Sequence, residues 1–481
     1  MDTAKRLTTN ALFIMVAKGL QPIVSFLMIM VIGRKLGVSV FGIYSTAISY
    51  ILIFQIIASF GMRTLITREV AKHRDQVESY LVNSLYIAIP LSLVAGILMC
   101  IFVLFIIKLD AETAKITCLL GFSLLASSIL ECFEGVLAGF EKIQTISYVY
   151  VIENFVKVGI CILLLYLGFQ LLTVIIIHIV TRYFAVILYI PSIAKLTKKV
   201  QIYPDWRFIK RFLKTAYIFA MTMIIVTIYW NIDIVLINKM QGNVDAGIYS
   251  GAKRFVLFLI TLIQSFFTAF FPVISELYES HVERFQEACK KSLLYLIIAA
   301  VPVTVIMTLL ADKIFYITFG TGFEESIWVL IILVWIIIPY SISQVFAYAL
   351  LASNNQRFDF RVNALALLCN GFLSWLLIKN YSYKGAAIAS LISIFVYVGM
   401  QTPFVLKNII KFDMHRLGVI TGKVAIGGFI MIALILLLSH MNLFGIVFLS
   451  TMVYFTILYL IKVFSEEDLQ FFKSMLKRRT A

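Results

Sequence analysis

The stretch Gly37-Val-Ser-Val-Phe-Gly42-Ile-Tyr-Ser45 returns 205 residues later as Gly242-Asn-Val-Asp-Ala-Gly247-Ile-Tyr-Ser250. Each copy lies in the short link between two long apolar segments. A repeat at a spacing of about six hydrophobic helices is typical of transporters built from two fused halves, which handle their substrate where the halves meet. We therefore expect two pseudo-symmetric lobes.

A second, weaker echo supports the repeat. Leu137-Ala-Gly139 and Leu351-Ala-Ser353 each end an apolar segment before a polar link, at an offset of 214 residues. Small insertions between the copies would explain the difference between the two offsets. The two echoes predict parallel lobes that are related by an axis along the membrane normal.

Composition agrees with a membrane protein. Hydrophobic residues make up 62% of the 481 residues and charged residues 14%, against about 25% charged residues in an average soluble domain. The net charge of +16 would suggest nucleic-acid binding in a soluble protein. Here the basic residues lie mostly between apolar runs, where they act as topology signals, and we expect no nucleic-acid partner. The six cysteines have no paired spacing, so we expect neither a disulfide framework nor a metal site.

Apolar runs long enough to cross a bilayer predict the fold class, an all-α polytopic membrane protein with about 14 transmembrane helices. Two six-helix lobes are followed by two extra C-terminal helices. The runs lie near 10–32, 40–61, 81–107, 116–139, 144–167, 170–191, 215–238, 247–273, 292–311, 326–351, 362–379, 385–406, 417–439 and 443–461. The first run is too long for the core of a signal peptide, and we expect it to be retained as the first span.

The distribution of charge predicts the orientation. Of the 41 lysines and arginines, 27 fall in the loops on the side of the N-terminus. The positive-inside rule therefore places both termini in the cytoplasm.

The predicted domains follow from the spans. They are a first lobe (1–191), a basic cytoplasmic linker (192–214), a second lobe (215–406), helices 13 and 14 (407–463) and an amphipathic cytoplasmic tail (464–481). The linker alternates bulky apolar and basic residues, and we expect it to form a short helix on the lipid surface that begins after Pro204-Asp205.

Several motifs resemble the polysaccharide-transport branch of the multidrug/oligosaccharidyl-lipid/polysaccharide exporters, the Wzx-type O-antigen flippases. The matching stretches are Gly33-Arg-Lys-Leu-Gly37 with Phe41-Gly-Ile-Tyr44, Ile232-Asp233-Ile-Val-Leu-Ile-Asn-Lys239 running into Gly247-Ile-Tyr249, Phe271-Pro272, and Lys384-Gly-Ala-Ala-Ile-Ala389. The motif residues look structural, because they shape turns.

The resemblance implies a MATE-like two-lobed flippase of the bacterial inner membrane, without enzymatic activity or cofactor. Its expected substrate is an undecaprenyl-diphosphate-linked oligosaccharide for O-antigen, capsule or exopolysaccharide, and its partners would be membrane lipids and a polysaccharide polymerase. A MurJ-type lipid II flippase and, less favoured, a cation-coupled multidrug exporter stay open. A membrane glycosyltransferase would need acidic residues concentrated in the loops, and the sequence has no P-loop for ATP.

Ionisable residues inside the spans are costly and mark candidate functional sites. An anionic diphosphate needs positive partners, so four basic residues are candidates for substrate binding: Lys18, Lys157, Arg182 and Arg254. Lys18 and Arg182 have no obvious acidic partner at the same depth, which favours a cationic cavity. Lys157 and Arg254 have an equally plausible structural role, in ion pairs with Glu153 and Asp233.

Acidic residues and one histidine are candidates for coupling to a proton or sodium gradient. These are Glu131, Glu153, Asp233 and His178. Burial disfavours the charged form of a carboxyl group, which makes protonation usable. Glu131 and Glu153 are predicted at similar depth, and Asp233 near Arg254. Structural ion pairs, and for His178 a hydrogen-bonded packing role, are the alternatives.

Overall fold

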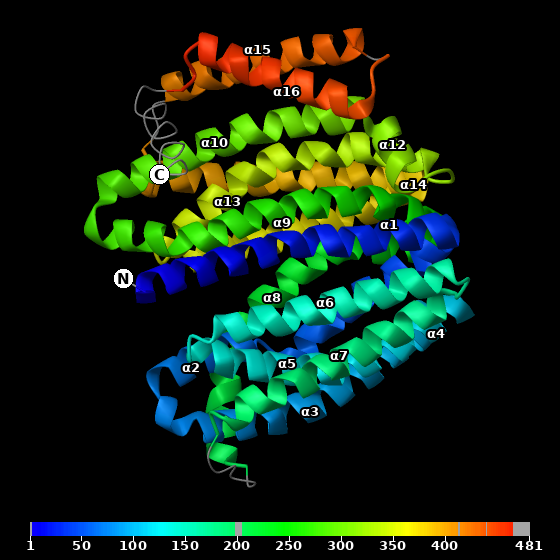
Figure 1. Ribbon diagram of the computed structural model, residues 1–481, viewed down its shortest axis with the longest axis vertical. Coiled ribbons are helices and arrows are strands. Elements are labelled where there is room, and N and C mark those ends of the chain that lie inside the picture. Colours follow the sequence, from blue (N-terminus) through cyan, green and yellow to red (C-terminus); the bar gives the residue numbers. More distant parts are fainter. Residues whose placement is uncertain (1, 198–203, 412–413, 439, 465–481) are drawn as a thin grey trace. The chain divides into compact units, whose positions relative to one another are not determined.

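The computed structural model describes residues 2–197, 204–411, 414–438 and 440–464. Side chains are described from Pro22 onward within these ranges, except at 208, 211–213, 215–219, 222, 269 and 414–417. The described chain is helical throughout and contains no strand (Figure 1). The predicted all-α fold is therefore confirmed.

The helices follow one another through short turns. Their bounds are α1 (Asp2–Ser59), α2 (Met62–Lys72), η1 (Arg74–Gln76), α3 (Val77–Ile101), the π-helical turn η2 (Phe102–Ile107), α4 (Ala111–Leu120), α5 (Phe122–Gly139), α6 (Ile143–Tyr166), α7 (Leu171–Ala194), α8 (Trp206–Gln241), α9 (Asn243–Ser280), α10 (Val282–Leu309), α11 (Ala311–Thr318), α12 (Glu324–Leu333), η3 (Val334–Ile336), α13 (Ile337–Ala352), α14 (Gln356–Asn408), α15 (Met414–Leu437) and α16 (Leu443–Leu460).

Twelve helical segments in the described chain are long and apolar enough to cross a membrane. Two of them are each broken by one residue with non-helical backbone angles. Gly37 breaks the segment Pro22–Lys72, and Ser382 breaks the segment Gln356–Asn408. Each broken segment covers two of the predicted spans. The twelve segments therefore correspond to the fourteen predicted spans.

The first glycine of each repeat copy has a positive φ angle. Gly37 has φ +80° and Gly242 has φ +93°, and both lie at the turn between two helices. A Cβ atom at either position would meet nothing within 4 Å, so the left-handed backbone, and not crowding, requires glycine there.

The second echo is also structural, with a small correction. Glu141 and Asn354 both have φ +60° at the ends of α5 and α13. The turn bonds Glu141 N–H to Ala138 O and Asn354 N–H to Leu351 O coincide at an offset of 213 residues. The predicted offset of 214 was wrong by one residue, because the turn geometry, and not the Leu-Ala letters, is the feature that repeats.

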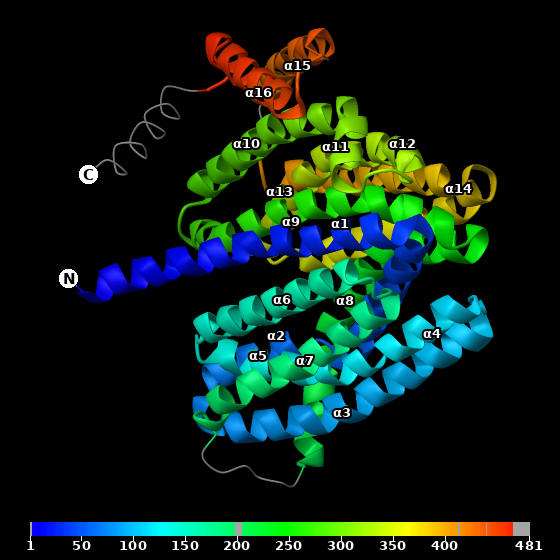
Figure 2. The ribbon, with the colours of Figure 1, turned by 45° about the vertical axis from the view of Figure 1, so that its right-hand side comes forward.

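The described chain forms two compact units, and we describe each by itself. Unit 1 contains residues 1–254, 319–325 and 363–390. In it α6 and α7 lie side by side in both views, and α1 contacts α6 and α8 (Figures 1 and 2). Unit 2 contains the remaining ranges, and in it α15 pairs with α16 while both contact α10. There Tyr454 donates a hydrogen bond to the carbonyl of Ile298 (3.0 Å).

The linker differs from its prediction in one respect. A helix does begin just after Pro204-Asp205, and Asp205 accepts a hydrogen bond from Arg207 N–H, but the helix continues without interruption to Gln241. No glycine or proline breaks the sequence 206–241. The amide of Asp205 donates to buried Asn83 Oδ1 of α3 (2.8 Å), which ties the start of α8 to α3. Residues 198–203, and the predicted tail from 465 onward, lie outside the described residues.

The two repeat motifs meet within unit 1. A Cβ atom on Gly42 would overlap the carbonyl oxygen of Asn243, and one on Gly247 would overlap the carbonyl oxygen of Val38. The two contacts are equivalent by the repeat. Position 243 corresponds to position 38, and position 247 corresponds to position 42, each at the offset of 205 residues. Small residues allow such close approach of helices in a membrane. We call this region (residues 38–45 and 243–250) the closed end.

We predict that Gly42→Ala and Gly247→Ala each destabilise the closed end. Each added methyl group would meet a backbone oxygen that no side-chain rotation moves away, and such overpacking costs about 1–3 kcal/mol. The melting temperature of the purified protein should fall in both variants. Gly159→Ala is the matched control, since a Cβ there meets nothing within 4 Å. Equal melting temperatures in all three variants would contradict the close contact.

Candidate functional site

A group of charged side chains lies on the adjacent helices α6 and α7. The guanidinium of Arg182 on α7 is 3.4 Å from the carboxylate of Glu153 on α6. Glu153 is buried and Arg182 is partly exposed, with 29% of its side chain accessible. Arg182 therefore does have an acidic partner at its depth, contrary to the prediction.

Two further candidates belong to the same group. The charge of Lys157 interacts with those of Arg182 and Glu153, and His178 lies within range of both Lys157 and Arg182. The salt bridge of Glu153 goes to Arg182, and not to Lys157, one helical turn away, as was considered from the sequence. The structure thus brings together four of the predicted site residues.

Arg254 extends this group across unit 1. Its charge interacts with the hydroxyl of Tyr44 on α1, and Tyr44 also lies near Cys161 on α6. Cys161 is in turn close to Lys157. We define the cation cluster as Lys157, Arg182, Arg254 and Glu153.

The cation cluster lies near the middle of the spans. Lys157 is nine residues before the end of α6, and Arg182 and Arg254 are each eleven residues after the start of α7 and α9. At 1.5 Å per residue these separations are roughly 14–17 Å, about half of a 30 Å hydrocarbon core. Three positive charges and one negative charge leave an excess of two positive charges.

One donor in the cluster has no acceptor. The buried Nε of Arg182 makes no hydrogen bond within the described part of the chain. Buried polar groups are almost always paired, so an orphaned guanidinium N–H is a reason to expect an acceptor from outside the protein. Charge-assisted bonds of this kind suit phosphate oxygens.

The acids of α5 interact with a different arginine. Glu134 makes a 2.8 Å salt bridge to Arg63 of α2 and accepts a hydrogen bond from Tyr189 of α7 (3.3 Å). Glu131 is half-buried beside Ser59 of α1, and the charges that act on it are those of Arg63 and Glu134. Glu134 also connects these acids to the cation cluster, because the charges of Glu134 and Glu153 both act on the Tyr189 hydroxyl.

Two other lysines within the predicted spans lie outside this cluster as described. Lys18 lies on α1, but its side chain is outside the described part of the structure. Lys423 on α15 donates to the carbonyl of Lys462, just beyond the end of α16 (3.3 Å). Lys423 therefore reaches a helix end and takes no part in the cation cluster.

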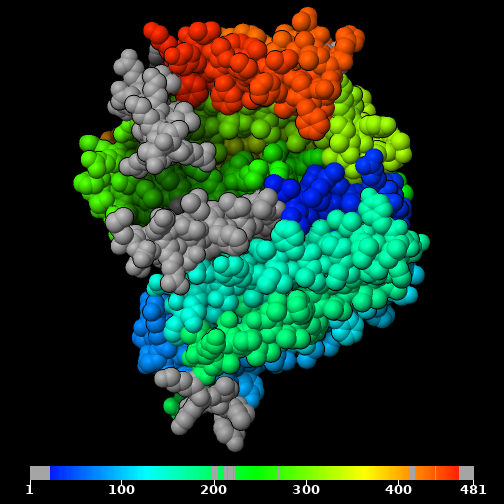
Figure 3. All heavy atoms as spheres, viewed as in Figure 1, coloured from blue at the N-terminus to red at the C-terminus, as the bar shows by residue number. Residues whose placement is uncertain are grey.

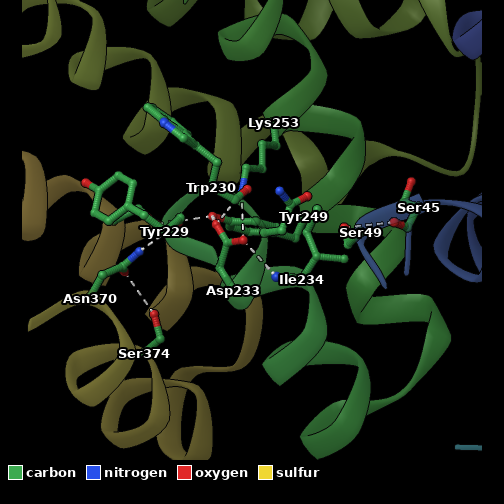
Figure 4. Close-up of polar contacts among 12 residues, drawn as sticks. Ser45, Ser49, Tyr229, Trp230, Asp233, Ile234, Tyr249, Lys253, Asn370 and Ser374 are labelled. Carbon is green, nitrogen blue, oxygen red and sulfur yellow. Dashed lines mark hydrogen bonds and ion pairs between the residues drawn. The ribbon is translucent and has the colours of Figure 1, made fainter. Parts of the chain in front are cut away.

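A second charged site is fully enclosed. Asp233 on α8 accepts two bonds from the Lys253 ammonium on α9 (2.6 and 2.5 Å), one from the Tyr249 hydroxyl and one from the Ile234 amide (Figure 4). Lys253 also donates to the carbonyl of Trp230 (2.7 Å). Asp233, Tyr249 and Lys253 are at most 4% exposed. We call these three residues the buried triad.

The buried triad connects α8 and α9 to α14. The Tyr249 hydroxyl lies 3.3 Å from Ser390 Oγ, and Asn370 donates to the carbonyl of Tyr229 (3.4 Å) (Figure 4). Because Asp233 and Lys253 cancel each other's charge and their hydrogen-bonding groups are satisfied, the triad stabilises the helix contacts and presents no free charge.

The sequence had placed Asp233 opposite Arg254, one residue from its true partner. Neighbouring helix positions differ by about 100° in direction, which depth alone does not resolve. A signal was available, because Tyr249 and Lys253 are four residues apart and share a helix face. Counting inward from the turn at 167–170 would likewise have matched Glu153 with Arg182.

On the face shown in Figure 3, side chains of α6 and α7 form a continuous surface of unit 1. Exposed large apolar residues are spread along both helices, for example Phe155 at 53%, Leu163 at 59%, Val180 at 58% and Ile187 at 61%. A surface of this composition is suited to contact with lipid. Fold and surface together define a multi-pass membrane protein.

Comparison with known proteins agrees with this class. The family model described as polysaccharide biosynthesis protein matches residues 7–278, more than half of the chain, and the MatE model matches residues 219–376. The chain is 23% identical over 188 residues to the probable low-salt glycan biosynthesis flippase Agl15 of Haloferax volcanii, a match that covers 39% of this chain and 40% of that relative.

Solved structures share the fold. The lipid II flippase MurJ in an inward closed conformation superposes with a TM-score of 0.76 at 16% identity, over 94% of this chain and 100% of that one. An inward-facing multidrug resistance MATE family transporter superposes with a TM-score of 0.64 at 13% identity, over 80% of this chain and 94% of that one. The chain belongs to the polysaccharide biosynthesis protein family, in the polysaccharide-transport branch of the multidrug/oligosaccharidyl-lipid/polysaccharide exporter superfamily.

We predict strong coupling between Asp233 and Lys253. Asp233→Asn leaves a buried ammonium without its counter-charge, and Lys253→Met leaves a buried carboxylate, each at a cost of about 3–5 kcal/mol. The double variant removes both charges and should be more stable than the sum of the two losses implies. Thermal unfolding of the four proteins in detergent measures this, and additive losses would show that the pair is not a unit.

Proposed function

We propose that this protein is a flippase that moves an undecaprenyl-diphosphate-linked oligosaccharide from the cytoplasmic to the outer leaflet of the bacterial inner membrane, with both termini in the cytoplasm. The observation that carries the proposal is the cation cluster, which combines an excess of two positive charges at mid-span with an unsatisfied buried guanidinium N–H. A diphosphate crossing the membrane needs such partners, because a charge in hydrocarbon is costly unless it is paired.

The chemistry of the cluster favours a phosphate over a cationic drug. A cavity for cations would be expected to carry excess negative charge, whereas the cluster holds one acid and three bases. The family membership and the flippase named among the relatives support the same substrate class. The pathway, whether O-antigen, capsule or exopolysaccharide, is left to the test, and a lipid II substrate of the MurJ type is the second candidate, favoured by the shared fold.

We further propose that transport proceeds by alternating access of the lobes 1–191 and 215–406. The closed end supports this, because it holds the two repeat motifs together through backbone contacts at Gly42 and Gly247. In the predicted orientation this end faces outward. Substrate would then enter from the cytoplasmic side and leave when the closed end separates.

A set of hydrogen bonds fastens the closed end on one side. Asn243 accepts from Asn238 Nδ2 (2.6 Å) and Thr113 Oγ1 (3.0 Å), and donates to Asp110 Oδ1 (3.2 Å). Lys239 donates to the carbonyl of Ile107. These bonds join the α3–α4 turn of the first lobe to the α8–α9 turn of the second.

The other side of the closed end is aromatic. The ring of Phe41 lies 5.7 Å from that of Phe319 and 5.8 Å from that of Phe323, centroid to centroid. Gly33 packs directly on Phe319. The position equivalent to Asn243 in the first repeat is Val38, whose side chain forms no hydrogen bonds. The hydrogen-bonded side of the closed end therefore has no counterpart in the first repeat.

Coupling to a proton or sodium gradient is part of the proposal. Asp233 already has Lys253 on both carboxylate oxygens, and Glu153 is paired with Arg182. Glu131 forms no salt bridge in the described part of the chain and lies half-buried beside Ser59, so we propose Glu131 as the coupling acid. His178 would act on the cation cluster through its neighbours Lys157 and Arg182.

We predict that Arg182→Ala and Lys157→Ala each reduce transport about tenfold or more, because each removes a charge-assisted bond to phosphate. Arg182→Ala alone leaves the buried carboxylate of Glu153 unpaired, which could impair folding. The double variant Arg182→Ala/Glu153→Gln also removes this charge, and so separates the effect on substrate binding from the effect on folding. It should accumulate in the membrane like the parent protein and still fail to transport.

The measurement is flipping of a fluorescent polyprenyl-diphosphate sugar in proteoliposomes, with Lys423→Ala as the matched control outside the cluster. Normal flipping by the double variant would refute the role of Arg182. Complementation decides between the two lipid-carrier substrates. Rescue of a strain that lacks an O-antigen or capsule flippase supports the oligosaccharide substrate, and rescue of a strain that lacks the lipid II flippase supports lipid II.

We predict that Asn243→Val, which installs the residue type of position 38, loosens the closed end. Ser45→Cys reports the opening, because Ser45 is fully buried there. A membrane-impermeant maleimide should label the introduced thiol several-fold faster when Asn243→Val is also present. Asn442→Val is the control, since Asn442 caps α16 in unit 2. Unchanged labelling with Asn243→Val would mean that the hydrogen bonds do not hold this end shut.

A further inference from the structure

A pocket lies away from the cation cluster, between α3, η2, α4, α5 and α7 of unit 1. Its volume is about 370 Å³, and its lining is almost entirely apolar. Gly96 and Gly121 form part of the wall, and the nearest atoms that a Cβ on Gly96 would meet lie 3.8 Å or more away. The absence of a side chain at Gly96 therefore leaves the space open, whereas a Cβ on Gly121 would meet the carbonyl oxygen of Cys118 at 2.9 Å.

The chain geometry around the pocket is irregular on both sides. The last turns of the third span are π-helical from Phe102 to Ile107, and the fourth span is divided at Gly121 between α4 and α5. The carbonyl of Phe122, just after this division, accepts a hydrogen bond from the Tyr183 hydroxyl (2.9 Å). Ser92 of the wall likewise donates its hydroxyl to the carbonyl of Ile89 (2.8 Å). Both wall hydroxyls are therefore satisfied from within the protein, and the remaining space suits a hydrocarbon.

The rim of the pocket is exposed and apolar. Ile97 is 60% exposed, Phe105 69% and Phe122 65%, and all three line the pocket. All lie within segments that are apolar enough to span a membrane. The pocket therefore opens where the surrounding solvent is lipid.

Two lysines stand at the end of the pocket nearest the α3–α4 turn. Lys115 is exposed and lies on the same face of the fourth span as Cys118 and Phe122, which line the pocket, because the three are spaced by three and four residues. Lys108 is exposed and directly follows η2. Glu112 is also exposed in this turn, whereas Asp110 is engaged by Thr113 and Asn243.

We propose that this pocket binds one chain of an anionic phospholipid, with the phosphate of the headgroup held between Lys108 and Lys115. Hydrocarbon alone gives no preference over the surrounding bilayer, since lipid tails are as apolar as the pocket. The lysines supply the selectivity for an anionic headgroup, at about fivefold for each. The bound lipid would lie against the turn that carries Asp110 and Thr113, which fasten the closed end.

The experiment uses phosphatidylglycerol with a photoactivatable group near the end of one acyl chain, reconstituted with the full-length protein. We expect labelling of the peptides that contain residues 92–105 and 118–125. Gly96→Leu fills the pocket and should abolish this labelling, and Ile97→Trp, at an exposed position, serves as a second variant if Gly96→Leu does not fold. Gly159→Leu is the matched control on the lipid-exposed side of α6 and should label like the parent protein.

The headgroup is tested separately. Phosphatidylcholine with the same chains should label these peptides at least fivefold less, and Lys108→Gln/Lys115→Gln should remove the difference between the two lipids. Unchanged labelling in both pocket variants, or equal labelling by the two lipids in the parent protein, would overturn the proposal. A third outcome is that polyprenyl phosphate, but not unlabelled phosphatidylglycerol, displaces the photoactivatable lipid. That outcome would assign the pocket to the substrate carrier and would likewise overturn the proposal.

Discussion

The contact between the two repeat motifs is made by backbone atoms. Gly42 lies against the carbonyl of Asn243 and Gly247 against the carbonyl of Val38, with no side chain between them. In a membrane, where hydrophobic burial does not draw helices together, such close packing is a main source of helix association. The rest of unit 1 depends on it, since the turns that carry Gly37 and Gly242 set the directions from which α1 and α9 enter the contact.

The two groups of charge inside the spans differ in net charge and in exposure, because the buried triad is enclosed whereas Arg182 of the cation cluster is partly exposed. In the buried triad, Lys253 has the carboxylate of Asp233 and the carbonyl of Trp230 as acceptors, and the net charge is zero. In the cation cluster, one acid faces three bases and a guanidinium N–H has no acceptor within the described chain. A buried pair that is satisfied contributes to structure, whereas an excess of positive charge inside a span is costly, which is the reason for proposing an anionic ligand at the cation cluster.

The sequence was sufficient for those features that follow from hydrophobicity and local backbone preference. The spans were predictable because each needs a long apolar run, and the repeat was visible because glycine at Gly37 and Gly242 is required by a left-handed backbone. Depth alone did not identify the partner of Asp233, because Lys253 and Arg254 share a depth and differ only in direction around α9. The helix face that Lys253 shares with Tyr249 was the signal that distinguishes the two. Glu153 and Arg182 lie at similar distances from the turn at 167–170, so counting inward from that turn indicates their common depth, and the packing of α6 on α7 then brings them into contact.

One helix links the closed end to the cation cluster. α9 carries Gly247 at the contact, Tyr249 and Lys253 in the buried triad, and Arg254 in the cluster, all within about two turns. The triad fastens α9 to α8, so the two helices would move together, while Arg254 interacts with Tyr44 on α1 across the repeat contact. A separation at Gly42 and Gly247 therefore has to change the surroundings of Arg254. In the proposed transport cycle, an anion bound there would interact differently with the closed and open states, and this difference in binding free energy is what a substrate needs in order to shift one state toward the other.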